Sequence, residues 1–123
     1  MEFLEQYVIH QDDRGSFNGI VNKYGWGEVN LIKTKADVVR GGHYHRFTKE
    51  LFFIIEGKIE VVVRHIVTKE NWTFTAVPNS AFIIDPYEVH TFTTMEYSSW
   101  LNMLSHKLDE DNPDLVRMPE TSK

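Results

Sequence analysis

Cysteine is absent from this sequence of 123 residues, so neither a disulfide nor a cysteine-based zinc site can hold its fold together. Basic residues are also few, since 13 Lys and Arg stand against 18 Asp and Glu, for a net charge of -5. This balance argues against nucleic acid or an anionic membrane as the main partner. Long apolar runs are missing, and the first residues carry acids where a secretory signal would carry bases. We therefore expect a soluble cytoplasmic protein with no membrane-spanning segment.

The residues that are present predict a single all-β domain over 1–123. Apolar residues make up 41% and aromatic residues 13% of the chain, enough for a folded core. Short segments of alternating or continuous apolar character, separated by turn residues, predict strands at 3–9, 16–21, 28–35, from 43, and at 51–55, 58–67, 72–77, 81–84, 90–94 and 98–105. Many short strands without a long helix indicate a β-sandwich or barrel. The polar tail over 106–123 is acidic and contains prolines, so we expect it to be partly mobile.

One predicted strand also indicates an oligomer. Residues 51–55 are apolar at every position, so both faces of this strand need a covering surface. An isolated small barrel would leave Leu51, Phe53 and Ile55 against water. We therefore expect a homodimer.

The candidate site lies in the stretch RGGHYHRFTKE, residues 40–50. His43 and His45 stand two residues apart, so on an extended strand they point to the same side. A short turn and a returning strand would bring Glu50 back beside them. Two histidines and a carboxylate that converge inside a sheet either bind a transition metal or perform acid/base chemistry.

These residues resemble the first motif of the cupin family, H-x-H-x(4)-E-x(6)-G, which His43, His45, Glu50 and Gly57 match in spacing. His90 falls at the histidine of the second cupin motif. Other motif positions are substituted, with Asp37 at the opening glycine of the first motif and Asn79, Asp85, Tyr87 and Thr94 in the second. The resemblance implies a double-stranded β-helix, or jelly-roll, barrel.

A narrower resemblance concerns the cupins that act on nucleotide sugars. The elements D-x-R-G-x-F, with Arg14 and Phe17, and R-G-G-H, with Arg40 and His43, are similar to those of dTDP-4-dehydrorhamnose 3,5-epimerases. R-G-G-H-x-H also resembles dTDP-sugar 3,4-ketoisomerases, and residues 108–114 resemble the cupin domain of capsular-polysaccharide nucleotide-sugar reductases. The resemblance implies an epimerase or ketoisomerase of a dTDP- or UDP-linked 4-keto deoxysugar in surface-polysaccharide synthesis.

The resemblance also implies roles for individual residues. His43 occupies the position of the base that removes a proton next to the ketone, and His45 matches the second catalytic histidine of the ketoisomerases. Arg14 and Arg40 correspond to arginines that hold the diphosphate. Two aromatic residues, Phe17 and the Tyr44 that lies between His43 and His45, are candidates to stack on the base or the sugar.

A metal is the open alternative for the same residues. His43, His45, Glu50 and His90 form the set with which metal-binding cupins hold zinc, nickel, iron or manganese. No organic cofactor is expected. If all four bind metal, the base must be another group, such as Tyr44, His65 or Tyr87. Two further hypotheses therefore stay open: a metal-dependent cupin of other chemistry and a non-catalytic sugar-binding module.

Overall fold

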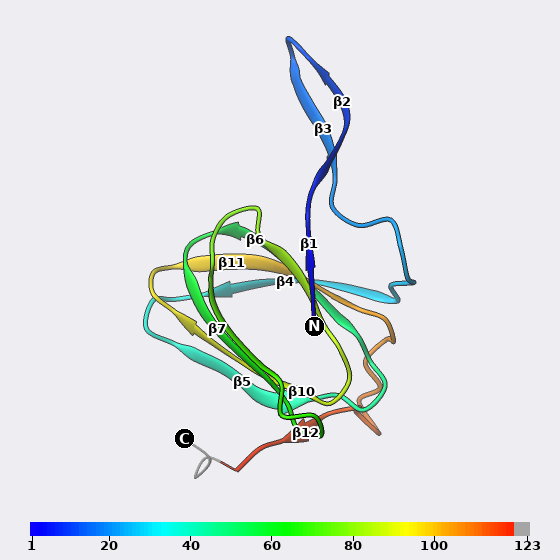
Figure 1. Cartoon of the computed structure of the whole chain (residues 1–123), viewed down its shortest axis with the longest axis vertical. Helices are drawn as coiled ribbons and strands as arrows, with labels where there is room; N and C mark the ends of the chain where they lie inside the picture. The colour runs from blue at the N-terminus through cyan, green and yellow to red at the C-terminus, as the bar shows by residue number, and fades with distance from the viewer. Residues whose placement is uncertain (120–123) are drawn as a thin grey trace.

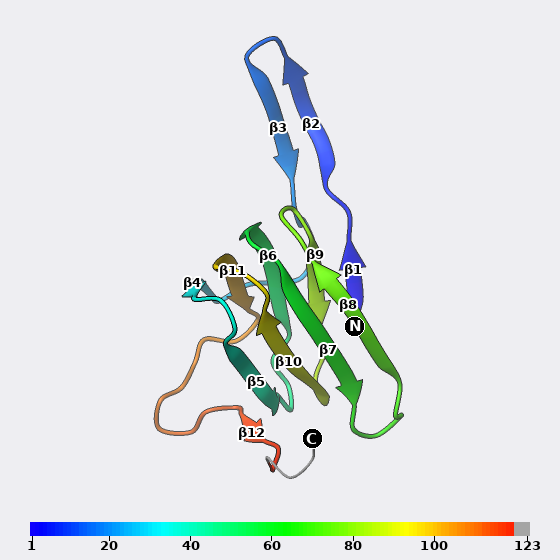
Figure 2. The same ribbon diagram turned by 90° about the vertical axis from the view of Figure 1, so that its left-hand side faces the viewer.

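Two five-stranded antiparallel sheets face each other in the computed structural model, which describes residues 1–119 (Figures 1 and 2). The first sheet has the order β1 (Glu2–Leu4), β9 (Ala81–Ile84), β6 (Glu50–Glu56), β11 (Ser98–Leu104) and β4 (Glu28–Thr34). The second has the order β12 (Val116–Arg117), β5 (Val39–Tyr44), β10 (Glu88–Thr94), β7 (Ile59–His65) and β8 (Asn71–Ala76). The prediction of an all-β jelly-roll barrel of the cupin type is confirmed. Residues 1–119 contain no helix long and apolar enough to cross a membrane.

The remaining two strands form an arm that projects away from the sheets (Figures 1 and 2). This arm consists of β2 (Tyr7–Asp12) and β3 (Gly15–Gly19), which within residues 1–119 pair only with each other. Its apolar side chains Val8, Ile9 and Phe17 are exposed. The strand predicted over residues 3–9 is therefore wrong as one element, because the chain leaves the first sheet after Leu4 and begins β2 at Tyr7.

The core lies between the inner faces of the two sheets. Strand β7 shows the pattern most clearly, because Ile59, Val61 and Val63 are fully buried while the residues between them are exposed. Aromatic rings from both sheets fill the centre of this space, and Phe52, Phe82, Phe92 and Trp100 are all buried. These rings form the apolar base on which the polar site rests.

Three residues at glycine positions of the cupin motifs keep the backbone conformation that favours glycine. Asp37, Asn79 and Tyr87 have φ angles of 60°, 75° and 66°. Asn and Asp tolerate this left-handed region because their short polar side chains bond locally, whereas for a tyrosine it is unusual. The second cupin turn is thus retained without its glycines.

The outer face of β6 is covered in part by the chain itself. The expected exposure of this strand in a lone barrel is wrong for Leu51, which is fully buried, whereas Phe53 is half-buried and Ile55 is 44% exposed. The segment between β3 and β4 returns at this end of the sheet, where the Gly27 N–H donates to the carbonyl of Leu104. Most of the exposed apolar surface that a partner could cover therefore lies outside β6.

The C-terminal segment lies against the second sheet as far as residue 119. Strand β12 forms the edge of this sheet beside β5, and the Met118 N–H donates to the carbonyl of Gly42. Mobility of the tail over 106–123 stays a prediction, and its last four residues lie outside the described part of the chain.

Candidate active site

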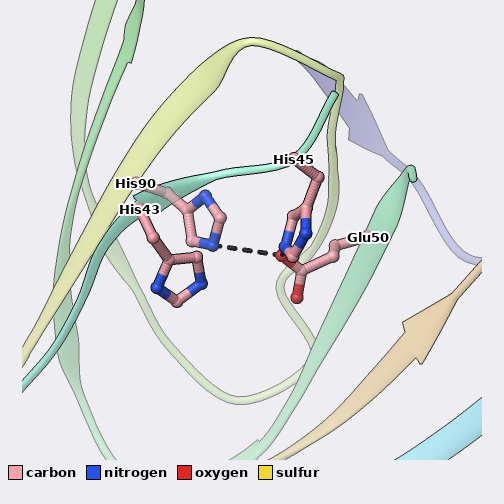
Figure 3. A group of neighbouring side chains, drawn as sticks. All are labelled: His43, His45, Glu50 and His90. Atoms are coloured by element: carbon pink, nitrogen blue, oxygen red, sulfur yellow. Dashed lines mark hydrogen bonds and ion pairs between the residues drawn. The ribbon is translucent and has the colours of Figure 1, made fainter. Parts of the chain in front are cut away.

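Four side chains, three on strands and one directly after a strand, point toward one another between the two sheets (Figure 3). His43 lies on β5 and His45 directly follows that strand. Glu50 begins β6, and His90 lies on β10 opposite His43 in the register. One ligand atom from each of the four lies within 4.8 Å of all the others. The sequence-predicted set is therefore brought together in space.

Glu50 is the centre of this cluster. Its Oε1 contacts Nε2 of His45 and lies 3.1 Å from Nε2 of His90. Its Oε2 accepts a hydrogen bond of 2.7 Å from Nδ2 of Asn102. Burial alone would raise the pKa of Glu50, but the attraction of His90 and the hydrogen bonds from both histidines lower it well below the ordinary value. The carboxylate is consequently ionised inside the barrel.

The pKa values of His43 and His45 are shifted in opposite directions. Burial, reinforced by repulsion from His90, lowers the pKa of His43 to about 4. Burial also acts to lower the pKa of His45, but its contact with Glu50 outweighs this and raises the pKa. His43 is therefore neutral at neutral pH, whereas the charged form of His45 is favoured.

Two of the three histidines are oriented by carbonyl oxygens behind them. Nδ1 of His45 donates to the carbonyl of Asp114, and Nδ1 of His90 donates to the carbonyl of Glu88 at 3.1 Å. Carbonyls accept only, so the Nδ1 atoms carry hydrogen and the Nε2 atoms face Glu50. Nδ1 of His43 is buried without a hydrogen-bond partner among residues 1–119. His43 is thus the least constrained of the three.

Asp114 ties the C-terminal segment to the loop after His45. Its carboxylate accepts hydrogen bonds from the backbone N–H groups of Arg46, Phe47 and Thr48 at 2.8, 3.0 and 2.9 Å, and from the Thr48 hydroxyl at 2.9 Å. We call this group of contacts the Asp114 clamp. Since the Asp114 carbonyl also holds His45, the clamp connects the fold of the tail to the geometry of the site.

The cluster opens into a cavity of about 490 Å³, within the range of small-molecule sites. One part of its wall is polar, with His43, Glu50, His90 and Asn102 together with Arg40 and Arg117. The other part is apolar, with Ile32, Val39, Phe52, Phe92 and Trp100. The cavity can therefore take a ligand that has both a polar reacting group and apolar surface.

The other residues singled out in the sequence are dispersed. Arg40 lines the cavity, but its Nε already donates to Oγ1 of Thr34 at 2.7 Å. Tyr44 does not line the cavity and instead has its ring 5.8 Å from that of Tyr87. Arg14 lies on the exposed arm, where it pairs with Asp12 at 2.6 Å.

Phe17 is exposed on the same arm, so neither it nor Arg14 reaches the cavity of its own chain (Figure 1). Sequence reasoning in turn missed Asn102, Asp114 and Arg117. Of these, Asn102 had a signal, because it is a polar residue on the inward side of an alternating strand. Arg117 lies in a segment without periodicity, and the resemblance of residues 108–114 to the reductase cupin domain assigned no role to Asp114.

Comparisons with known proteins place this site in context. The sequence model of the polysaccharide biosynthesis C-terminal domain family matches residues 10–116. UDP-2-acetamido-2,6-beta-L-arabino-hexul-4-ose reductase from Pseudomonas aeruginosa is 28% identical over 116 residues, which cover 91% of this chain and 31% of the reductase. The chain thus spans about a third of the length of this curated relative.

Two solved structures share the fold. A 3,4-ketoisomerase from Helicobacter canadensis has a TM-score of 0.79 at 18% identity, covering 95% of this chain and 90% of that one. The dTDP-4-dehydrorhamnose 3,5-epimerase of Bacillus anthracis, with TDP and PPi bound, has a TM-score of 0.78 at 17% identity, covering 96% and 78%. The predicted resemblance to epimerase-type and ketoisomerase-type cupins is confirmed.

Proposed function

We propose, from the premise that this chain belongs to the polysaccharide biosynthesis C-terminal domain family, that it modifies a nucleotide-linked sugar for a surface polysaccharide. The reaction would be epimerisation beside the ketone, or relocation of the keto group, of a 4-keto deoxysugar carried on dTDP or UDP. The names of the reductase relative and of the two structural neighbours support this class of substrate. We further propose that the enzyme acts in the cytoplasm.

A neutral, unpartnered imidazole in a cavity that also contains two arginines carries the proposal. His43 lines the cavity, and its Nδ1 is buried with no hydrogen-bond partner among the described residues. Its lowered pKa keeps His43 unprotonated at neutral pH, as a base must be before it accepts a proton from carbon. Arg40 and Arg117 lie in the same wall and can accept the negative charge of a diphosphate.

His45 would supply the complementary acid. Its contact with Glu50 raises its pKa, so it can hold the proton that His43 lacks. A pair of titratable groups with opposite shifts is typical of acid/base sites, because one accepts a proton while the other donates one. In the proposed reaction without a metal, the N–H of His45 that contacts Glu50 would turn to the ketone oxygen while the enolate forms; with a metal bound, His45 would be a ligand and the ion would take over this role.

The site also fits one divalent transition metal, which we propose as zinc, nickel, iron or manganese. His45, Glu50 and His90 would hold it, because the carbonyl partners of both histidines leave Nε2 directed at Glu50. Such an ion would supply a Lewis acid that polarises the ketone oxygen. His43 lacks a carbonyl partner and would stay free as the base, whereas the sequence-level ligand set counts it as the fourth ligand.

Solvent deuterium exchange tests the function. The intact protein should incorporate deuterium beside the ketone of a dTDP- or UDP-linked 4-keto deoxysugar, as followed by NMR or mass spectrometry. His43→Asn should slow this exchange by about 10²- to 10⁴-fold, the usual contribution of a general base. The exposed His106→Asn is the matched control and should exchange at the normal rate. Normal exchange by His43→Asn would move the base elsewhere.

If the intact protein exchanges no deuterium with any such substrate but still binds it, the non-catalytic sugar-binding module is the better description. If it binds none but holds metal, a metal-dependent cupin of other chemistry is favoured. Binding and metal content should therefore be measured on the same preparation.

We propose a homodimer on the basis of an apolar outer face on β4 and β11. Val29 and Leu31 are 58% and 56% exposed, and they pair in register with Met103 and Leu101. Burying each of the exposed side chains against a second copy would contribute about 1.5–3 kcal/mol. Light scattering should give twice the monomer mass at micromolar concentration.

Two substitutions distinguish this surface from other exposed apolar positions. Leu31→Asp should shift the mass to that of a monomer. Val62→Asp, on the outer face of the other sheet, should remain dimeric. In such a dimer the arm of one copy would extend over the other, which is the arrangement in which Arg14 and Phe17 could still contact substrate. A monomeric wild type would remove both proposals.

A further inference from the structure

Strand β12 places Arg117 at the mouth of the cavity. In the pairing of β12 with β5, Arg117 stands opposite His43, and the Met118 N–H donates to the carbonyl of Gly42 at 2.8 Å. Directly opposed residues of an antiparallel pair present their side chains on the same face of the sheet. Arg117 accordingly lines the cavity together with His43.

The Arg117 side chain is not engaged by the protein. It is exposed, and within residues 1–119 its guanidinium makes no hydrogen bond or ion pair. Arg40, the other arginine of the wall, donates from Nε to Thr34 and from a terminal nitrogen to the carbonyl of Lys33 at 3.5 Å. Arg117 therefore has its full set of donors available to a ligand, whereas Arg40 has part of its set committed.

The charge of the wall is opposite to that of the chain. The cavity is lined by two arginines and one carboxylate, Glu50, and this carboxylate is already bonded to His45, His90 and Asn102. Counting only arginine, lysine and carboxylate groups, the lining carries a net charge of +1, while the whole chain carries -5. An anion would thus be attracted to this cavity in preference to the rest of the surface.

We infer that Arg117 is a substrate-binding residue that grips the diphosphate of the nucleotide sugar, an inference that rests on the function proposed above. A guanidinium presents paired N–H donors that match two phosphate oxygens, so it binds in bidentate fashion. From its position opposite His43, Arg117 would hold the diphosphate at the mouth and leave the sugar to fill the cavity next to the base. Arg40 would contribute a second contact from the same wall.

The Asp114 clamp gives this arginine a fixed position. Asp114 lies three residues before Arg117 and anchors the segment through four hydrogen bonds to residues 46–48. The same segment holds His45 through the Asp114 carbonyl. Binding of the anion and orientation of His45 are consequently supported by one short stretch of the C-terminal segment.

Calorimetric binding of TDP, UDP, inorganic pyrophosphate and thymidine tests the inference. Arg117→Gln should bind TDP, UDP and pyrophosphate about 10- to 100-fold more weakly than wild type, since it loses a charge-assisted bidentate contact. Arg117→Lys keeps the charge but loses the paired donors of the guanidinium. Its affinity for these compounds should lie between those of wild type and Arg117→Gln. Thymidine has no phosphate, so its binding should not change. Arg64→Gln is the matched control, because Arg64 is an exposed arginine on β7 outside the cavity.

The outcomes separate this inference from the proposed function. If wild type binds TDP or UDP and Arg117→Gln binds them equally well, the role of Arg117 is wrong while the proposed function stands. If wild type binds none of the phosphate compounds, both are wrong. If Arg117→Gln and Arg64→Gln are weakened equally, the effect is one of net charge and the inference fails. Thermal melting of each variant shows that the barrel is intact.

Discussion

Replacement of Asp114 by alanine is the substitution that most directly tests how the tail supports the site. The carboxylate accepts four hydrogen bonds from residues 46–48. The loop that it holds separates His45 from Glu50, so its loss affects both the stability of the fold and the geometry of the cluster.

The loss of stability in Asp114→Ala depends on which of the four donors can bind water once the carboxylate is gone. Thr48 is 4% exposed, and leaving its N–H and hydroxyl without an acceptor costs about 1–1.5 kcal/mol each. Arg46 and Phe47 are exposed, so water replaces the carboxylate at a cost of about 0.5 kcal/mol each. The free energy of unfolding should fall by about 3–4 kcal/mol, which lowers Tm of a domain of this size by about 12–16 °C.

Thermal and urea unfolding measure this loss, with Glu110→Ala as the control on an exposed acid of the same segment. Asp114→Asn keeps one acceptor oxygen and should lose about half as much as Asp114→Ala. A Tm for Asp114→Ala within about 2 °C of wild type would show that the clamp contributes nothing and that the tail does not anchor the loop.

Three further outcomes are expected. Burial alone would raise the pKa of Asp114, but hydrogen bonds from the loop amides lower it, so its ionised form stabilises the fold above about pH 4 and this contribution is lost as the pH falls through the lowered pKa. The difference in unfolding free energy between wild type and Asp114→Asn should therefore be constant from about pH 5 to 8 and shrink toward pH 3, and a difference that grows on acidification would contradict this. Gly57→Ala should destabilise the protein by about 2–4 kcal/mol in urea unfolding, because φ is +100° and the new Cβ would lie 2.1 Å from Oγ of Ser98; Gly25→Ala, with open space around it, should change stability little. Glu50→Gln should reduce the metal bound per chain at least about 10-fold by mass spectrometry, and a metal-free wild type would refute the proposed metal.

The convergence of His43, His45 and Glu50 was predictable because it depends on residues that are close together in the sequence. His43 and His45 share a side through the strand period, and Glu50 returns through one turn, so spacing alone brings them together. His90 is forty residues further along the chain than Glu50, and only the motif spacing indicated its place. The structure realises that place through the register that sets His90 opposite His43.

Backbone conformation at the substituted glycines was only partly predictable. Asn79 is a residue type that tolerates a left-handed turn, so the survival of its turn could be expected. Tyr87 has no such tendency, yet it takes a φ of 66° because the chain on both sides of it is held in place. Its N–H donates to the carbonyl of His45 and its carbonyl accepts from Ile66.

The parts of the site contributed by the C-terminal segment could not be predicted. Asp114 is 69 residues from His45 in the sequence and lies among acids that resemble a solvated tail. Nothing local distinguishes it from Asp109 or Asp111, since its role depends on where the segment crosses the barrel. The outward course of the arm is likewise set by the absence of pairing beyond β1, which residues 7–19 do not encode by themselves.

The separation of the arm from both sheets has a consequence for local stability. A two-stranded hairpin that pairs with no further strand among residues 1–119 is marginally stable in water, so β2 and β3 can open without disturbing the barrel. In an isolated copy the arm amides should exchange with solvent far faster than those of β6, which is paired on both sides. If protection of the arm amides increases with protein concentration, two molecules associate through the arm. The protected amides then identify the residues in contact, even where the exchange of the barrel amides does not change.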